Sequence, residues 1–344
     1  MTYFVSANHS VRYHGGRSWP PVILSAALRA VRLHSDFNFI LCGDRSVIDP
    51  ELAKLSDADR SRVTVRHCED VIAMTDSPSQ ALRHKKDSSM RRAIEAVQTK
   101  QADACVSAGN TGALMCLAYY LIKTLQGIDR PALVSFMPTA GHHRVLLLDL
   151  GANVNCTSEA LFQYAVMGSV LAEQMLGKQR PRVALLNVGE EDIKGNTLVK
   201  MADEHLKQVP ALNYIGYVEG DDIFTDYADV VVTDGFTGNV ALKSSEGLAK
   251  LVVNEVKKQS SSNLWSRLMA RIALPLLKSI YNRVNPDQYN GASLIGLRGI
   301  VVKSHGNASA DAFYYAILQA MQEARLRVPE QIKSKIETVL LEQL

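Results

Sequence analysis

Short apolar runs, each followed by a glycine-containing turn and then by a helical pattern, recur along this chain of 344 residues. The clearest is Val183–Val188, in which Asn187 is the only polar residue. Such runs are typical of strands buried on both faces of a parallel sheet, because helices cover both sides. The alternation therefore predicts a Rossmann-like three-layer α/β fold, with a mainly parallel sheet and helices on both faces. We expect residues 1–344 to form one such domain.

Four of the predicted strand-to-helix turns combine glycine with polar side chains. They are centred on Asn110, Asn153, Lys194 and Asn239. Ligands of open α/β sheets bind at the carboxyl ends of the strands, where helix N-termini and exposed backbone N–H groups attract anions. Turn chemistry alone would explain any one of these turns. Four of them on one edge of a sheet predict a shared hollow for a small anion.

Two other segments carry candidate binding residues. The basic, hydroxyl-rich stretch Ala81–Met90 leads into a predicted helix, and Ser88 and Ser89 lie where that helix should begin. They suit an N-cap and equally suit a loop that contacts an anion, so both interpretations stay open. Near the C-terminus, His305 closes the predicted last strand, Ala292–His305. It is either a packed histidine or a site residue, and we favour the site.

The residue pattern of the chain changes after residue 260. Apolar residues recur at helical spacing on both sides of Pro275, with arginine and lysine between them. Because Pro275 should interrupt the helix, we predict a protruding amphipathic helical hairpin, inserted over residues 260–290. Its basic face and its tryptophan suit an anionic membrane surface, whereas a dimer interface or core packing would explain the same apolar side chains. The candidate contact residues are Trp265, Leu268, Ile272, Leu276 and Leu277.

Composition argues against several classes of protein. A net charge of +3 is too small to favour nucleic acid binding. The five cysteines form no C-x-x-C pair and several lie in apolar runs, which is typical of a reducing cytosol without disulfides or a zinc site. The N-terminus lacks a signal-peptide pattern, and no apolar run reaches the length of about 18 residues that a membrane span needs. We therefore expect a cytoplasmic protein without a bound metal.

Six motifs occur in the order found in one known family. They are K-K-D-S-S-M (85–90), S-A-G-N-T-G-A-L-M (107–115), L-L-D-L-G-A-N (147–153), L-L-N-V-G-E-E-D-I-K-G-N (185–196), D-G-F-T-G-N-V-A-L-K (234–243) and K-S-H-G (303–306). From about Pro20 onward the chain thus resembles the PlsX-type phosphate acyltransferases of bacterial phospholipid synthesis. The resemblance implies transfer of a fatty acyl group from acyl carrier protein to inorganic phosphate, without a metal or organic cofactor. It also implies a homodimer, peripheral contact with the inner face of the cell membrane, and a downstream acyl-phosphate:glycerol-3-phosphate acyltransferase.

The resemblance places catalysis at Lys194 and Asn239. Phosphate is already a nucleophile near neutral pH and a thiolate leaves easily, so the site must supply anion binding, alignment and charge stabilisation. We assign Lys194 to the charge of the phosphate or of the oxyanion, and Asn239 to hydrogen bonding of the same centre. The other candidates for binding phosphate or substrate are Ser88, Ser89, Asn110, Thr111, Asn153, Asn187, Glu190, Asp234, Thr237 and His305.

The N-terminal segment departs from the family pattern. The family has Asp-x-Met-Gly-Gly-Asp-x-Gly-Pro after its first strand, whereas this chain has R-Y-H-G-G-R-S-W-P over residues 12–20. Met1–Tyr13 is also a poor buried strand by its pattern. The genetic code allows a one-base frame shift to convert one motif into the other, and we infer such a shift in the gene or its sequencing. Codons for residues 11–20 that cannot be shifted in this way would exclude it.

Two other functions stay open. One is a phosphate acetyl- or butyryltransferase, which performs related chemistry on coenzyme A thioesters. The other is an inactive, membrane-associated scaffold of the lipid pathway, suggested by the altered N-terminal motif and by the segment around Trp265. If Arg17 is genuine, the phosphate pocket would lack acidic and glycine groups that the family has there.

Overall fold

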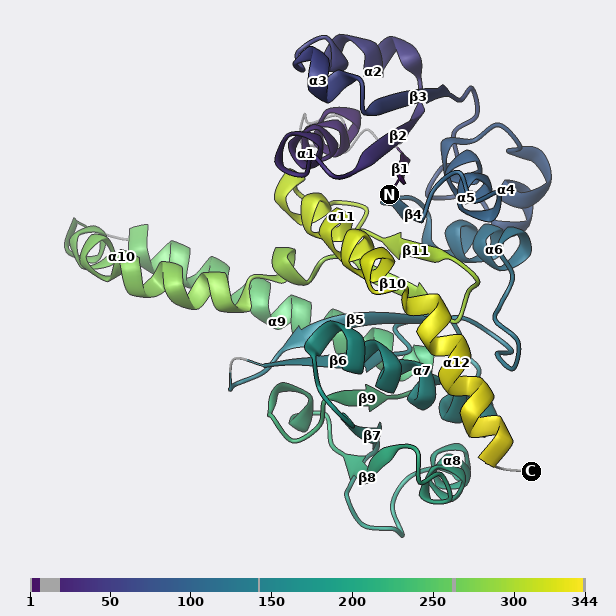
Figure 1. The fold of residues 1–344 in the computed structure, drawn as a ribbon. Coiled ribbons are helices and arrows are strands. Elements are labelled where there is room, and N and C mark those ends of the chain that lie inside the picture. The colour runs from purple at the N-terminus through teal and green to yellow at the C-terminus, as the bar shows by residue number, and fades with distance from the viewer. Residues whose placement is uncertain (1, 7–18, 142, 262–263, 343–344) are drawn as a thin grey trace.

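An 11-stranded sheet runs through the whole molecule (Figure 1). The computed structural model describes residues 2–6, 19–141, 143–261 and 264–342. Across the sheet the strand order is β3-β2-β1-β4-β11-β10-β5-β6-β9-β7-β8. The strands are β1 Thr2–Ser6, β2 Asn38–Gly43, β3 Val63–His67, β4 Ala104–Ser107, β5 Ala132–Pro138, β6 Arg144–Leu148, β7 Arg182–Leu186, β8 Asn213–Val218, β9 Val230–Val232, β10 Ala292–Ile295 and β11 Ile300–Lys303.

The sheet consists of two parallel halves that run in opposite directions. One half comprises β3, β2, β1, β4 and β11, and the other comprises β6, β9, β7 and β8. Between them, β10 and β5 pair antiparallel with each other and with their outer neighbours. The prediction that four turns share one edge of the sheet is therefore wrong. Asn110 follows a strand of the first half, whereas Asn153, Lys194 and Asn239 follow strands of the second.

Helices cover both faces of the sheet, which confirms the predicted α/β class. In the first half, α5 and α6 pack on one face, and α1 and α11 pack on the other. In the second half, α7 and α12 cover one face and α9 crosses the other beside β6. The helices are α1 Trp19–Leu33, α2 Arg45–Leu52, α3 Asp57–Arg60, α4 Pro78–His84, α5 Ser89–Gln98, α6 Thr111–Leu121, α7 Ser158–Leu176, α8 Thr197–Lys207, α9 Gly235–Ser261, α10 Leu264–Val284, α11 Ala310–Arg325 and α12 Val328–Glu342.

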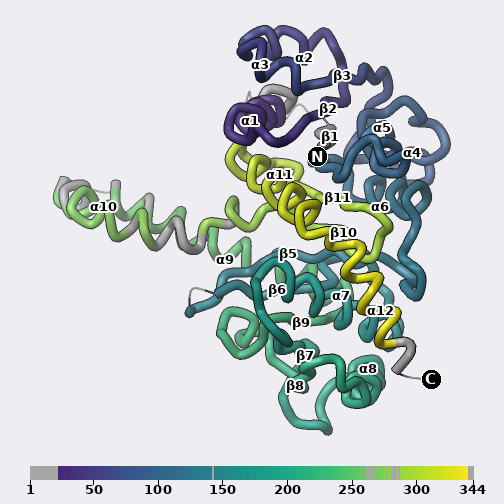
Figure 2. Tube along the Cα trace, viewed as in Figure 1, coloured from purple at the N-terminus to yellow at the C-terminus, as the bar shows by residue number. Residues whose placement is uncertain are grey.

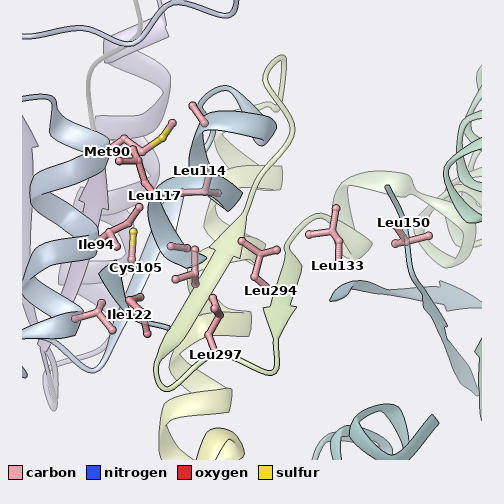
Figure 3. Packing of buried hydrophobic residues seen from close by; sticks show 14 of the residues in the cluster. Met90, Ile94, Cys105, Leu114, Leu117, Ile122, Leu133, Leu150, Leu294 and Leu297 are labelled. Carbon is pink, nitrogen blue, oxygen red and sulfur yellow. The ribbon is translucent and has the colours of Figure 1, made fainter. Parts of the chain in front are cut away.

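Alternate residues of the central strands pack into different hydrophobic clusters. In β6, Val145 and Leu147 join one cluster, whereas Leu146 and Leu148 join another on the opposite face. Figure 3 shows the first cluster, in which side chains of α5, α6, β10 and β5 pack together. Both faces of these strands are buried, and this explains why their sequences are continuous apolar runs.

Two expectations about strands are wrong. The N-terminal segment, whose pattern suits a buried strand poorly, forms β1 between β2 and β4, because parallel backbone pairing on both sides supports it. Most of the departing motif at 12–20 lies outside the described residues. The predicted single strand Ala292–His305 is instead the antiparallel pair β10 and β11. The chain turns between them at Gly296, whose φ of +89° favours glycine.

Helices α9 and α10 lie side by side and extend away from the body of the molecule (Figures 1 and 2). The predicted boundaries of this hairpin were wrong, since its first arm is α9 and α10 continues through Pro275. The proline removes one N–H donor without ending the helix. Trp265, Ile272 and Leu276 are exposed on α10, whereas the side chains of Leu268 and Leu277 lie outside the described part. None of the described helices combines the length and apolar character that a membrane crossing requires.

Candidate active site

A cavity of about 640 Å³ lies between β5 and α9. Along α9, the lining residues Asn239, Lys243 and Glu246 come first and are followed by the apolar residues Leu248, Ala249, Val252 and Val253. The cavity consequently has a charged end and an apolar end, a combination common in ligand-binding pockets of this size. Its polar lining is completed by Thr111, Ser135, Ser245, Lys303 and His305, and its apolar lining includes Phe136, Met137, Phe224, Leu248, Ala249, Val252 and Val253.

The first turn of α9 is fixed by Asp234. Its carboxylate accepts the backbone N–H of Phe236 and of Thr237, both at 2.9 Å, and the hydroxyl of Thr237 at 2.6 Å. Gly238 packs so closely on the end of β6 that an added Cβ would lie 2.1 Å from the carbonyl oxygen of Asp149. This contact brings the exposed side chain of Asn239 to the cavity. Asp234 and Thr237 thus shape the turn, and of the two predicted catalytic residues Asn239 is the one that lines the cavity.

Glu246 binds two side chains at the charged end, one of a lysine and one of a histidine. Its Oε2 lies 3.0 Å from Nζ of Lys243, and its Oε1 lies 3.1 Å from Nε2 of His305. Burial alone would raise the pKa of Glu246, but hydrogen bonds and charge from His305 and Lys243 lower that pKa to about 2. Glu246 is therefore ionised at neutral pH and holds both side chains in place.

His305 is held by a buried asparagine as well. The backbone N–H of His305 donates to Oδ1 of Asn290 at 2.9 Å, and Nδ2 of Asn290 donates to the Ser304 hydroxyl at 2.7 Å. The same amide donates to the carbonyl of Ala312 in α11. These bonds fix the turn after β11, and His305 lines the cavity, while its role in binding stays a prediction.

Lys303 is the last residue of β11, and only 8% of its surface is exposed. It lines the cavity, and in the described part of the chain the partner of its Nζ is the carbonyl of Ser304. Burial, and to a smaller extent the charge of Lys243, lower the pKa of Lys303 to about 7. A lysine buried without a carboxylate partner is costly, and such lysines are concentrated at functional sites.

Asn110 caps the helix that begins with Thr111, and its side-chain amide hydrogen-bonds to backbone groups. Its Oδ1 accepts the N–H of Ala113 and so caps α6, and its Nδ2 donates to the carbonyls of residues 73, 74 and 76. Thr111, the first residue of α6, contributes to the lining. Thr111 is therefore the better placed of these two predicted binding residues.

Ser88 and Ser89 are buried at the start of α5. The Ser88 hydroxyl accepts the N–H of Arg91 and donates to the carbonyl of Lys85, which confirms the N-cap interpretation for this residue. Neither serine is among the described residues that line the cavity.

Asn153 is buried and connects two turns next to the cavity. Its Nδ2 donates to Asp149 at 3.1 Å and to the carbonyl of Pro131, and its own carbonyl accepts the N–H of Gly235. Burial raises the pKa of Asp149, although four hydrogen bonds from the amides of Leu133, residue 152 and Asn153 act against that rise. Asn153 thus joins the turn after β6 to the turn after β9.

Lys194 does not appear among the described lining residues of the cavity. It lies on the exposed loop after β7, together with the exposed Glu190. The amide of Asn187 donates to the carbonyl of Gly189 at 3.0 Å and so stabilises the start of this loop. Because β7 and β9 are neighbours in the sheet, the loop follows the strand adjacent to the one that leads to Asn239.

Sequence reasoning missed three residues of the charged end, namely Lys243, Glu246 and Lys303. Two of them were visible in the motifs, since Lys243 ends the motif at 234–243 and Lys303 begins the motif at 303–306. Glu246 lies one helical turn after Lys243, where a charged residue on a helix usually indicates a solvated face. In the part of the chain that the structure describes, no group of three or more His, Cys, Asp or Glu side chains forms a metal site.

The chain matches the sequence profile of the family described as "Fatty acid synthesis protein" over residues 9–331. The chain belongs to this family. A phosphate acyltransferase of Pseudoalteromonas atlantica is 59% identical over 328 residues, which cover 95% of this chain and 96% of the relative. A phosphate acyltransferase of Shewanella putrefaciens is 53% identical with the same coverage. Members of the family that carry this name are therefore similar to the chain along nearly its whole length.

Solved structures agree on the fold. A phosphotransacetylase from Streptococcus pyogenes superposes with a TM-score of 0.62 at 17% identity and 94% coverage of both chains. A branched-chain phosphotransacylase from Enterococcus faecalis superposes with a TM-score of 0.58 at 16% identity, covering 94% of this chain and 99% of that one. At such low identity the comparison establishes the mixed α/β architecture alone.

Proposed function

We propose that this protein is a phosphate acyltransferase that transfers a fatty acyl group from acyl carrier protein to inorganic phosphate, in phospholipid biosynthesis. The observation that carries this proposal is the cavity itself, in which an apolar wall adjoins a cluster of cationic and amide side chains. A fatty acyl thioester and an anion need these two environments side by side. The near full-length similarity to phosphate acyltransferases supports the same reaction.

In the proposed mechanism the acyl chain lies along Ala249, Val252 and Val253 of α9 and its thioester carbonyl reaches Asn239. A phosphate oxygen attacks the carbonyl carbon, and the amide of Asn239 donates a hydrogen bond to the oxyanion that forms. The C–S bond then breaks and the thiolate leaves with its electron pair. Lys243, held by Glu246, provides positive charge for the phosphate, and Lys243 and His305 provide hydrogen-bond donors.

Lys194 remains part of this proposal as the second catalytic residue. Its loop is exposed and follows a strand next to β9, so it can approach the charged end from the solvent side. In that role the lysine neutralises charge on the phosphate or on the oxyanion. Asn187 and Glu190 shape the same loop, and we assign them to positioning Lys194.

The deciding experiment measures acyl phosphate formed by the purified chain from acyl carrier protein thioesters and inorganic phosphate. A parallel assay with coenzyme A thioesters distinguishes a phosphate acetyl- or butyryltransferase, which would prefer them. Turnover that depends on phosphate excludes the inactive scaffold. Absence of acyl phosphate with either thioester would contradict the proposed function.

We extend the proposal to the arm formed by α9 and α10, which we assign to contact with an anionic membrane surface, with a partner copy of the chain, or with both. Trp265 is 70% exposed, and Ile272 and Leu276 are 67% and 64% exposed. Apolar side chains of this size in solvent commonly indicate an interaction surface. We accordingly assign the protein to the cytoplasm, at the inner face of the cell membrane, where a downstream acyltransferase would use its product.

Flotation with anionic vesicles tests the membrane contact, and light scattering tests the dimer. The double variant Ile272→Glu/Leu276→Glu should lose vesicle binding if the arm contacts lipid. Loss of the dimer with retained vesicle binding would assign the arm to self-association instead.

A further inference from the structure

Lys303 is positioned to bind an anion in the cavity. It lies at the end of β11, it lines the cavity, and it is almost entirely buried. In the described part of the chain its Nζ donates to the carbonyl of Ser304, the next residue. A buried amine with one neutral partner retains hydrogen-bonding capacity toward the cavity, because an ammonium has three donors.

The charged groups that face Lys303 come from α9 and from its own turn. Lys243 and Glu246 lie on α9, and His305 follows Lys303 by two residues. Glu246 is already bound to both Lys243 and His305, so its charge is shared between them. The residues that pair with Lys303 on β4 and β10 are uncharged. Among the described residues that line the cavity, the one carboxylate is that of Glu246, and Lys243 and His305 already bind it.

We propose that Lys303 is a further catalytic residue, which contacts inorganic phosphate and gains a proton as the phosphate binds. This proposal rests on the proposed function, since it takes phosphate to be the nucleophile in this cavity. Lys243 and His305 would then position the phosphate, and Lys303 would take a proton from it.

The proton transfer balances in the following way. When dihydrogen phosphate enters, one of its O–H bonds breaks and the electron pair stays on oxygen, while the lone pair of Nζ forms a new N–H bond. The cavity then holds the phosphate dianion beside an ammonium group. After the dianion has attacked and the C–S bond has broken, the ammonium returns the proton to the thiolate sulfur. The products are the thiol and the acyl phosphate, and Lys303 is neutral again.

Burial supports this assignment, because it lowers the pKa of Lys303 to about 7 and thus makes the neutral amine available near neutral pH. An approaching anion has the opposite effect, since a negative charge within a few ångströms favours the protonated form. Binding of the anion therefore favours protonation of Lys303, and protonation of Lys303 favours binding of the anion.

Calorimetric titration of the full chain with inorganic phosphate tests the proposal. At pH 7.5, in two buffers with different enthalpies of ionisation, the heats give the number of protons taken up per phosphate bound. The wild type should take up more protons than Lys303→Arg, whose guanidinium stays charged throughout. Lys303→Met should bind phosphate about a hundredfold more weakly, and Lys250→Met, on the exposed side of α9, should match the wild type in both measurements.

Equal proton uptake by the wild type and Lys303→Arg would overturn the proposal, and so would wild-type phosphate affinity in Lys303→Met. Thermal melting of each variant separates these outcomes from a failure to fold, because an unfolded variant has no transition. The two proposals fail separately. Acyl phosphate production with equal proton uptake would refute the role of Lys303 alone, whereas proton-coupled phosphate binding without any acyl transfer would refute the proposed function alone.

Discussion

His305 and Glu246 bind each other at the charged end of the cavity, with Nε2 of His305 3.1 Å from Oε1 of Glu246. This contact joins the turn after β11 to α9 at about three turns from the start of the helix, and the two elements are far apart in the sequence. Glu246 also binds Lys243, so one carboxylate organises two of the groups that we assign to phosphate binding. The stability of α9 on the sheet and the arrangement of the site thus depend on the same residue.

Replacing Glu246 should lower the stability of the protein by an amount that depends on pH. The pKa of Glu246 is lowered from 4.5 to about 2, so its contribution is present above pH 4.5 and is lost as the pH falls through 2. Glu246→Gln should reduce the free energy of unfolding by about 1–3 kcal/mol at pH 7, and this difference should shrink below pH 4. Urea denaturation at several pH values measures it. Glu204→Gln, on the exposed face of α8, serves as the control and should change little.

Removing the amide of Asn239 should slow the reaction without affecting the fold. One donor to an oxyanion typically contributes about 2.7–4 kcal/mol, so Asn239→Ala should lower kcat by a hundredfold or more. Steady-state acyl phosphate formation gives the rate, and circular dichroism checks the fold. Asn254→Ala changes the same residue type on the exposed side of α9 and should remain active. A fully active Asn239→Ala would contradict the assignment.

Lys194→Ala should also slow turnover by at least about a hundredfold, because the variant loses a cation near the developing charge. Its melting temperature should match that of the wild type, since Lys194 is exposed in its loop. Lys333→Ala, an exposed substitution on α12, is the matched control. Near wild-type acyl phosphate production would show that the loop stays away from the charged end.

Enlarging a residue of the apolar wall should change the preference for acyl chain length. Ala249→Phe would displace two or three methylene groups of a long chain, and each buried methylene contributes about 0.8 kcal/mol. The ratio of kcat/KM for hexadecanoyl over octanoyl thioesters should therefore fall by roughly thirtyfold. Leu251→Phe, exposed on the same helix, should keep the wild-type ratio. An unchanged ratio in Ala249→Phe would place the acyl chain elsewhere.

Lys303→Met should stabilise the protein while it impairs function. The folded pKa of about 7 lies below the ordinary value of 10.5, so the buried lysine destabilises the fold fully below pH 7. That cost disappears as the pH rises toward 10.5. The gain on substitution should be on the order of several kcal/mol at pH 6 and much smaller at pH 10. Denaturation of both proteins at pH 6, 8 and 10 checks the trend, and a loss of stability at pH 6 would contradict it.

Local sequence pattern was sufficient to predict several of the strands and the fold class. The run at Val183–Val188 is largely β7, and its continuous apolar character follows from burial on both faces. The reversal of strand direction was not predictable in this way. It results from the antiparallel pairing of β10 with β5, in which Ser293 lies opposite Val134, a contact between residues distant in the sequence.

The candidate site was predictable in residue type more than in role. Asparagine after a strand was taken as a feature of the site, yet Asn110 and Asn153 use their amides on backbone partners, as asparagine commonly does at caps and turns. The sequence cannot distinguish such an amide from one that faces a ligand, as Asn239 does. Lys303 was missed because a lysine at the end of a strand is usually exposed, and its burial depends on tertiary packing.

A single uninterrupted helix, α9, begins at the reacting centre and ends in the projecting arm. A force applied at the tip of the arm is therefore transmitted along the helix to Ala249, Val252 and Val253, which line the cavity. Any surface that tilts the arm would widen or narrow the space for the hydrocarbon tail, so docking and substrate capacity are mechanically linked.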